Sequence, residues 1–248
     1  MYAITDTVAL VTGGTRGIGL ALAEALLQAG GRVAINGRGT TPEAEALLAQ
    51  WGIERVLPIW GDVSDPAMAR SAVDQAASWG GRLDILVHAA GGPAPGKVTD
   101  LTADAWMDAF AIHVHPVFHL FRAAHPHLVQ KGGAVLLISS VAGIRGCPGT
   151  IAYQTVKGAL IPMAKALAFD HGPENIRVNV LAPGIIRTRF HQAMTPEAKA
   201  HNIGTRIPLR REGTVQDVAE AGMTLLRNEF ITGEVLVIDG GMSMRITG

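Results

Sequence analysis

The sequence has few of the residues that several classes of protein require. Its single cysteine, Cys147, excludes an internal disulfide framework and a multi-cysteine zinc site, and we expect a reducing compartment. Its 21 basic and 21 acidic residues give a formal net charge of zero, without the basic excess that nucleic-acid or membrane-surface binding needs. No apolar run reaches about 20 residues, and the first seven residues lack the basic start of a signal peptide. We therefore expect a soluble, cytoplasmic protein with neither nucleic-acid nor membrane partners.

Strand-like and helix-like segments alternate along the 248 residues. Runs rich in Val, Ile and Leu predict strands over 8–11, 32–36, 56–59, 83–88, 134–139, 177–181 and 234–238. Helices are predicted over 20–29, 42–51, 66–78, 103–129, 151–169 and 214–226, with Pro116 and Pro126 breaking or bending the fourth. Continuous apolar strands separated by helices are typical of a parallel sheet covered on both faces. We expect residues 1–248 to form one α/β domain, a single doubly wound parallel sheet with helices on both faces.

A glycine-rich turn, T-G-G-T-R-G-I-G, lies between the first predicted strand and the first helix, from Thr12 to Gly19. Glycines at this place let the backbone approach a pyrophosphate, and the helix N-terminus adds free N–H groups and positive partial charge. The turn therefore predicts a dinucleotide site. A plain tight turn is the alternative interpretation.

The end of the second predicted strand bears on the choice of dinucleotide. An acidic residue there bonds the adenine ribose hydroxyls of NAD and repels a 2′-phosphate. This strand ends at Asn36-Gly37-Arg38, without a carboxylate, and Arg16 lies inside the glycine turn. Two guanidinium groups can bind one phosphate through charge-assisted hydrogen bonds. We expect NADP(H) in preference to NAD(H), unless Arg38 is only a solvated loop residue.

Five motifs, in order and at matching spacing, resemble those of the short-chain dehydrogenase/reductase family over nearly the whole chain. They are the glycine turn, H-A-A-G at 88–91, Ser140 with Tyr153 and Lys157, Asn179 with P-G-I-I-R-T at 183–188, and the ending at 232–241. The resemblance implies a Rossmann-like fold and hydride transfer between NADP(H) and a ketone or secondary alcohol. It also implies a homotetramer or homodimer built on the long helices of 103–129 and 151–169. The chain is similar both to 3-oxoacyl reductases and to sugar or polyol dehydrogenases, and the substrate stays open.

Tyr153 and Lys157 are four residues apart on a predicted helix, so both side chains lie on one face. A phenol has an ordinary pKa of about 10, and a neighbouring ammonium group is expected to lower it. The resemblance makes Tyr153 the acid and base, Lys157 its partner and a contact of the nicotinamide ribose, and Ser140 the group that polarises the substrate carbonyl. A core tyrosine is the alternative, but the chain has only two tyrosines.

Two histidines stand where the family has asparagine. His113 aligns with the asparagine of a catalytic tetrad, and His88 with one near the nicotinamide ribose. His113 is a catalytic candidate because imidazole can donate and accept a proton. It is otherwise a structural residue or the mark of a slower enzyme. These departures support a second hypothesis, in which the chain is a catalytically weakened NADP(H)-binding sensor or structural protein.

The stretch from 113 to 127 contains five histidines, and His115 and His119 have a spacing that could bind zinc on a helix. Pro116 disturbs that helix, so we expect no metal site and assign these histidines to a subunit interface. By the resemblance, substrate specificity lies in loops 92–98, 141–150 and 185–206, the last of them a lid. The expected cofactor-binding residues, besides Tyr153 and Lys157, are Gly13, Thr15, Arg16, Gly17, Ile18, Gly19, Arg38, Asp62, Val63, Ala90, Gly91, Pro183, Gly184, Ile186 and Thr188.

Overall fold

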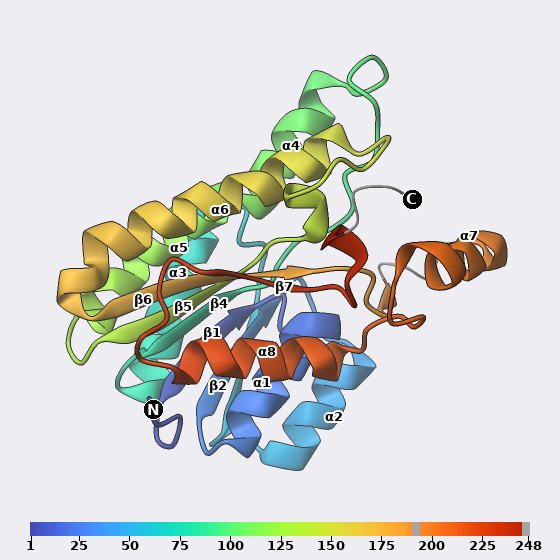
Figure 1. The fold of residues 1–248 in the computed structure, drawn as a ribbon. Helices are drawn as coiled ribbons and strands as arrows, with labels where there is room; N and C mark the ends of the chain where they lie inside the picture. The colour runs from blue at the N-terminus through green and yellow to red at the C-terminus, as the bar shows by residue number, and fades with distance from the viewer. Residues whose placement is uncertain (190–193, 245–248) are drawn as a thin grey trace.

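Seven parallel strands form one sheet in the computed structural model, which describes residues 1–189 and 194–244 (Figure 1). Their order across the sheet is β3-β2-β1-β4-β5-β6-β7, so the chain winds outward from the centre in both directions. The predicted doubly wound sheet is confirmed, and each predicted strand end lies within two residues of the observed one. The strands are β1 (Val8–Thr12), β2 (Arg32–Gly37), β3 (Val56–Trp60), β4 (Ile85–His88), β5 (Gly133–Ile138), β6 (Ile176–Pro183) and β7 (Val235–Ile238).

Helices cover both faces of the sheet (Figure 1). One face packs against α1, α2 and α8, and the other against α3, α5 and α6, each layer enclosing its own apolar core. No helix in the described part of the chain is long and apolar enough to cross a membrane. The helices are α1 (Gly17–Gln28), α2 (Pro42–Trp51), α3 (Pro66–Gly80), α4 (Ala103–His113), α5 (His115–Leu128), α6 (Ile151–His171), α7 (Pro196–His201) and α8 (Val215–Arg227).

Three helical details differ from the prediction. The segment 103–129 breaks at Val114, because Pro116 has no N–H to continue the helix and instead begins α5. Pro126, by contrast, lies inside α5 without breaking it. The first helix begins at Gly17, inside the glycine turn, which brings its N-terminal N–H groups to the end of β1.

The predicted lid, 185–206, contains structure that the sequence did not reveal. It includes α7 and one turn of π-helix, Asn202–Arg206, and a bridge joins Ile186 to Gly213 at its start. Residues 190–193 of this lid lie outside the described residues. The segment follows β6 and therefore starts at the carboxyl edge of the sheet, where the strands β1, β4 and β5 also end.

Candidate active site

A cavity of ≈ 1140 Å³ opens along the carboxyl edge of the sheet. Ligands of doubly wound sheets bind at this edge, where the strand order reverses, which here is between β1 and β4. Every residue predicted for catalysis or cofactor binding lines this cavity. The parallel arrangement explains the result, because motifs that follow different strands are brought to a single edge.

The glycine turn fits a dinucleotide, and its glycines differ in purpose. Gly17 has a φ of +57°, and a Cβ built on it would meet only Thr188 at 3.7 Å, so its open side faces the cavity. A Cβ on Gly13 would lie 2.7 Å from the backbone of Ala89 and Ala90, so that glycine lets β1 and β4 approach each other. The backbone at Gly17 and the N-terminus of α1 therefore provide a cradle for phosphate oxygens.

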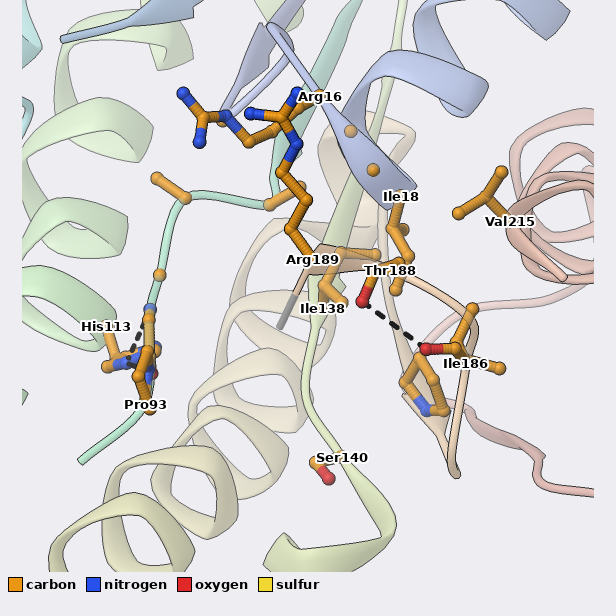
Figure 2. A pocket seen from close by; sticks show the side chains of 18 of the residues that line it. Arg16, Ile18, Pro93, His113, Ile138, Ser140, Ile186, Thr188, Arg189 and Val215 are labelled. Carbon is orange, nitrogen blue, oxygen red and sulfur yellow. Dashed lines mark hydrogen bonds between the residues drawn. The ribbon is translucent and has the colours of Figure 1, made fainter. Parts of the chain in front are cut away.

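One end of the cavity is basic. Arg16 and Arg38 are exposed there and line it. Arg189 projects toward the same end as Arg16, away from Ser140 (Figure 2). Its Nη2 donates to Glu43 Oε1 at 2.9 Å, a contact between residues 146 apart in the chain. Sequence reasoning missed this pair, because Glu43 follows the N-terminus of α2 rather than the end of β2.

Two further predicted cofactor residues are fixed by their own turns. Asp62, after β3, accepts a hydrogen bond from the backbone N–H of Ser64 at 3.0 Å. Thr188 Oγ1 donates to the carbonyl of Ile186 at 3.3 Å, across the wall of the cavity (Figure 2). Both side chains still line the cavity, so their positions agree with the prediction while their contacts remain internal to the protein.

Tyr153 lies in the first turn of α6, and Ser140 lies just after β5. The Ser140 hydroxyl forms a hydrogen bond with the Tyr153 phenol, and Ser140 Oγ also accepts the N–H of Ala142 at 3.1 Å. This second bond orients the serine. Gly143 allows the close approach of the two elements, since a Cβ there would lie 2.7 Å from the backbone of α6.

Lys157 is buried one helical turn beyond Tyr153. Its Nζ donates to the carbonyl of Ile138 at 2.8 Å and lies 5.8 Å from the centroid of the Tyr153 ring. Burial lowers the pKa of Lys157 from 10.5 to about 8. The ammonium group is thus held by the end of β5 at the floor of the cavity.

The expected lowering of the Tyr153 pKa is corrected by the structure. Burial raises the pKa of Tyr153, and the hydrogen bond from Ser140 only partly opposes this. The predicted effect of Lys157 is missing, because its amine faces the Ile138 carbonyl rather than the phenol oxygen. Tyr153 therefore keeps its proton at neutral pH, which suits a proton donor.

His113 lies at the end of α4 and is 2% exposed. Its Nε2 is 3.0 Å from the Gly92 carbonyl, while its Nδ1 has no hydrogen-bond partner among the described residues. Burial, then the charge of Lys157, lower its pKa from 6.5 to about 3. Gly91 makes room for the ring, because a Cβ there would be 2.5 Å from His113 Cε1. His113 is therefore a neutral imidazole at the cavity wall.

His88 does not line the cavity. It is 2% exposed at the end of β4, and its Nδ1 is 2.9 Å from Thr12 Oγ1. Burial, followed by the charge of Lys157, lowers its pKa from 6.5 to about 3, and the backbone of His113 opposes this. The histidine stands behind the wall, so a direct contact with a ribose in the cavity is not available to it.

The three predicted substrate loops meet at the other end of the cavity. Loops 92–98 and 141–150 are joined, since the Gly96 N–H donates to the Gly149 carbonyl at 2.7 Å. Cys147 lines the cavity, and its backbone N–H is held by Gln154 Oε1 at 2.8 Å. From the third loop, Arg206 reaches the cavity and donates to Asn202 Oδ1 at 3.0 Å.

Comparison with known proteins agrees with this geometry. A family model described as enoyl-(acyl carrier protein) reductase matches residues 13–243. A granaticin polyketide synthase putative ketoacyl reductase 2 of Streptomyces violaceoruber is 38% identical, with 94% of this chain and 95% of that protein covered. The 3-oxoacyl-[acyl-carrier-protein] reductase FabG of Chlamydia trachomatis is 31% identical, with 97% and 98% covered.

A solved structure gives the same result for the fold. A short-chain dehydrogenase from Burkholderia cenocepacia, in complex with NADP, superposes with a TM-score of 0.90 at 34% identity, with 97% of this chain and 99% of that chain covered. The fold, the site and these relatives define an oxidoreductase that uses a nicotinamide cofactor. The chain belongs to the short-chain dehydrogenase/reductase family, as its motifs predicted.

Proposed function

We propose that this protein is an NADP(H)-dependent reductase that interconverts a ketone and a secondary alcohol, with Tyr153 as the acid and base. The observation that carries the proposal is the buried Tyr153 phenol, hydrogen-bonded to Ser140 inside a cavity that also fits a dinucleotide. The ketoacyl and 3-oxoacyl reductases among its relatives support the same chemistry.

The cofactor would lie along the cavity from the basic end to Tyr153. Gly17 and the N-terminus of α1 would hold its pyrophosphate, and Arg16 and Arg38 its 2′-phosphate. Lys157 and Thr188 would contact the nicotinamide half. When bound, NADPH supplies a hydride to the carbonyl carbon of the substrate.

The side chains of the protein would manage the proton of this reaction. The Tyr153 hydroxyl donates its proton to the carbonyl oxygen, and Ser140 hydrogen-bonds to the same oxygen and orients it. The raised pKa of Tyr153 favours the protonated phenol, so the site is better prepared for reduction than for oxidation. Lys157, held by the Ile138 carbonyl, stabilises the phenolate that remains.

His113 would complete the site as a neutral hydrogen-bonding group. Its ring is close to that of Tyr153, and its Nδ1 is free of partners among the described residues. With Nε2–H donated to the Gly92 carbonyl, Nδ1 is an acceptor that can hold a water molecule on the path from Lys157. This is the task that the family assigns to asparagine.

The chain would act as a single unit of 248 residues in the cytoplasm, with 185–206 as the substrate lid. A homotetramer or homodimer is supported by large apolar side chains exposed on the long helices. Met107 is 56%, Phe118 53% and Phe169 86% exposed. Exposed apolar groups gathered on neighbouring helices are typical of subunit interfaces.

The test is the oxidation of NADPH and NADH with 3-oxoesters, diketones, simple ketones and aldoses, by the wild type and by Tyr153→Phe. We expect turnover that Tyr153→Phe reduces by about 10²–10⁴-fold, the range for general acid catalysis. Tyr2→Phe, the other tyrosine, is the matched control and should keep full activity. If Tyr153→Phe turns over normally, the mechanism is wrong. If NADPH binds but no substrate is turned over, the chain is the binding protein of the second hypothesis.

A further inference from the structure

Two histidines and a glutamate meet far from the cavity. His125 is near the end of α5, His171 ends α6, and Glu174 ends the following turn, η2 (Gly172–Glu174). The distance from Glu174 Oε2 is 2.8 Å to His125 Nε2 and 2.7 Å to His171 Nδ1. His171 lies 18 residues beyond Tyr153 on the same helix, which corresponds to about 27 Å at 1.5 Å per residue.

The orientation of the two imidazole rings is fixed by packing. Their centroids are 4.9 Å apart, and the ring of Phe121 is 4.8 Å from that of His171 and 6.2 Å from that of His125. Both rings therefore turn a nitrogen toward the same carboxylate oxygen. Rings held in place by neighbours are typical of ligand groups that are prepared before an ion binds.

The charge of the cluster also suits a cation. The hydrogen bonds from His125 and His171 hold the pKa of Glu174 below its ordinary value, so the group is a carboxylate at neutral pH. The three side chains are between 25% and 35% exposed, which leaves a side open to solvent. An ion could enter there, and a water molecule could occupy a fourth position.

We propose that His125, His171 and Glu174 bind a divalent transition-metal ion, with zinc the ion whose ligand preferences they match. Zinc takes imidazole nitrogens and carboxylate oxygens in tetrahedral sites, at about 2.0–2.2 Å. The candidate ligand atoms lie within 4.8 Å of one another, and tetrahedral bonds of that length need about 3.3 Å between them. Small rotations of the side chains close this difference, and the ion replaces the protons now shared with Glu174.

The site would join three elements that end at one edge of the molecule. A bound ion ties the end of α5 to the end of α6 and to the turn before β6. The expected absence of a metal site rested on the sequence-local pair His115 and His119. The cluster becomes visible only after folding, because His125 and Glu174 are 49 residues apart.

The experiment uses the purified full-length protein, freed of metal with a chelator and titrated with zinc chloride by calorimetry. Cobalt chloride is added in parallel, because tetrahedral cobalt absorbs visible light and reports the ligand geometry. The variants are His125→Gln, His171→Gln and Glu174→Gln. His119→Gln, a histidine of α5 outside the cluster, is the matched control. Thermal unfolding without metal shows that each variant is folded.

We expect one zinc ion per chain and, at a hundredfold excess of zinc over the dissociation constant, a rise in Tm of about 5 °C. Each cluster variant should weaken binding at least about a hundredfold, while His119→Gln binds as the wild type does. Equal binding by the wild type and all folded cluster variants overturns the proposal, as does a lack of binding by the wild type. Neither result depends on reductase activity, so the proposed function is tested separately.

Discussion

The imidazole of His113 stands edge-on to the phenol of Tyr153, with ring centroids 5.9 Å apart and an angle of 86° between the ring planes. The neighbouring Lys157 lowers the pKa of His113, as burial does, so the ring stays neutral over the working range of the enzyme. His113 therefore differs from a titrating general base, and it acts, if at all, through hydrogen bonds. This distinction can be measured.

Replacing His113 by alanine should lower kcat by up to about a hundredfold, the cost of misplacing a reacting group by an ångström. The reason is that the Gly92 loop loses its anchor, and the cavity loses an acceptor beside Tyr153. His113→Asn should recover most of the loss, because an amide can also donate and accept. Initial rates and the dissociation constant of NADPH, which should stay within about threefold, check this.

The pH profile separates the two possible roles of His113. Since its pKa is about 3, neither variant should shift an acidic inflection of kcat between pH 5 and 7. A new or displaced inflection in His113→Asn would show that the imidazole titrates during turnover. An unchanged kcat in His113→Ala would leave the residue a structural one.

Gly91→Ala should destabilise the protein because its new Cβ collides with the His113 ring, and overpacking of this kind costs about 1–3 kcal/mol. The cost should fall when His113→Ala is also present, which removes the ring. Urea unfolding of the wild type, both single variants and the double variant measures the coupling. Gly92→Ala is the matched control, because a Cβ there meets nothing within 4 Å. An equal cost of Gly91→Ala in both backgrounds would mean that the two residues do not interact.

The two buried histidines should make the fold sensitive to acid. The folded-state pKa is about 3 for both His88 and His113, against 6.5 for the unfolded chain. Above pH 6.5 neither state binds the proton. As the pH falls from 6.5 toward 3, only the unfolded state does, so the free energy of unfolding decreases. The loss is about 2–3 kcal/mol per histidine at pH 4.5.

Urea unfolding at pH 7 and at pH 4.5 checks this acid effect. The double variant His88→Asn, His113→Asn should lose less stability between these pH values than the wild type does. His127→Asn, a partly exposed histidine of α5, is the control. Parallel losses in all three proteins would contradict the assignment of the acid effect to the buried pair.

Much of the site could be predicted from the sequence because the motifs depend on local geometry. The glycine turn, Ser140 and Tyr153 each follow a strand or begin a helix, and parallel strands bring such positions to one edge. Contacts set by tertiary packing could not be predicted. Lys157 was expected to lower the pKa of the phenol, but its amine bonds the Ile138 carbonyl. His88 was expected near the cofactor, and it lies behind the cavity wall.

The basic end of the cavity predicts the cofactor preference. Arg16→Ala and Arg38→Ala should each lower kcat/KM for NADPH by about 10–100-fold, the cost of one charge-assisted hydrogen bond. Both should change kcat/KM for NADH by less than about threefold, because NADH has no 2′-phosphate for these arginines to bind. The ratio of the two values in each variant is the measurement. Arg70→Ala, an exposed arginine paired with Asp74 outside the cavity, is the control and should leave the ratio unchanged. If both cofactors lose activity equally, the two arginines bind the shared pyrophosphate, and the preference for NADP(H) has no basis at this end.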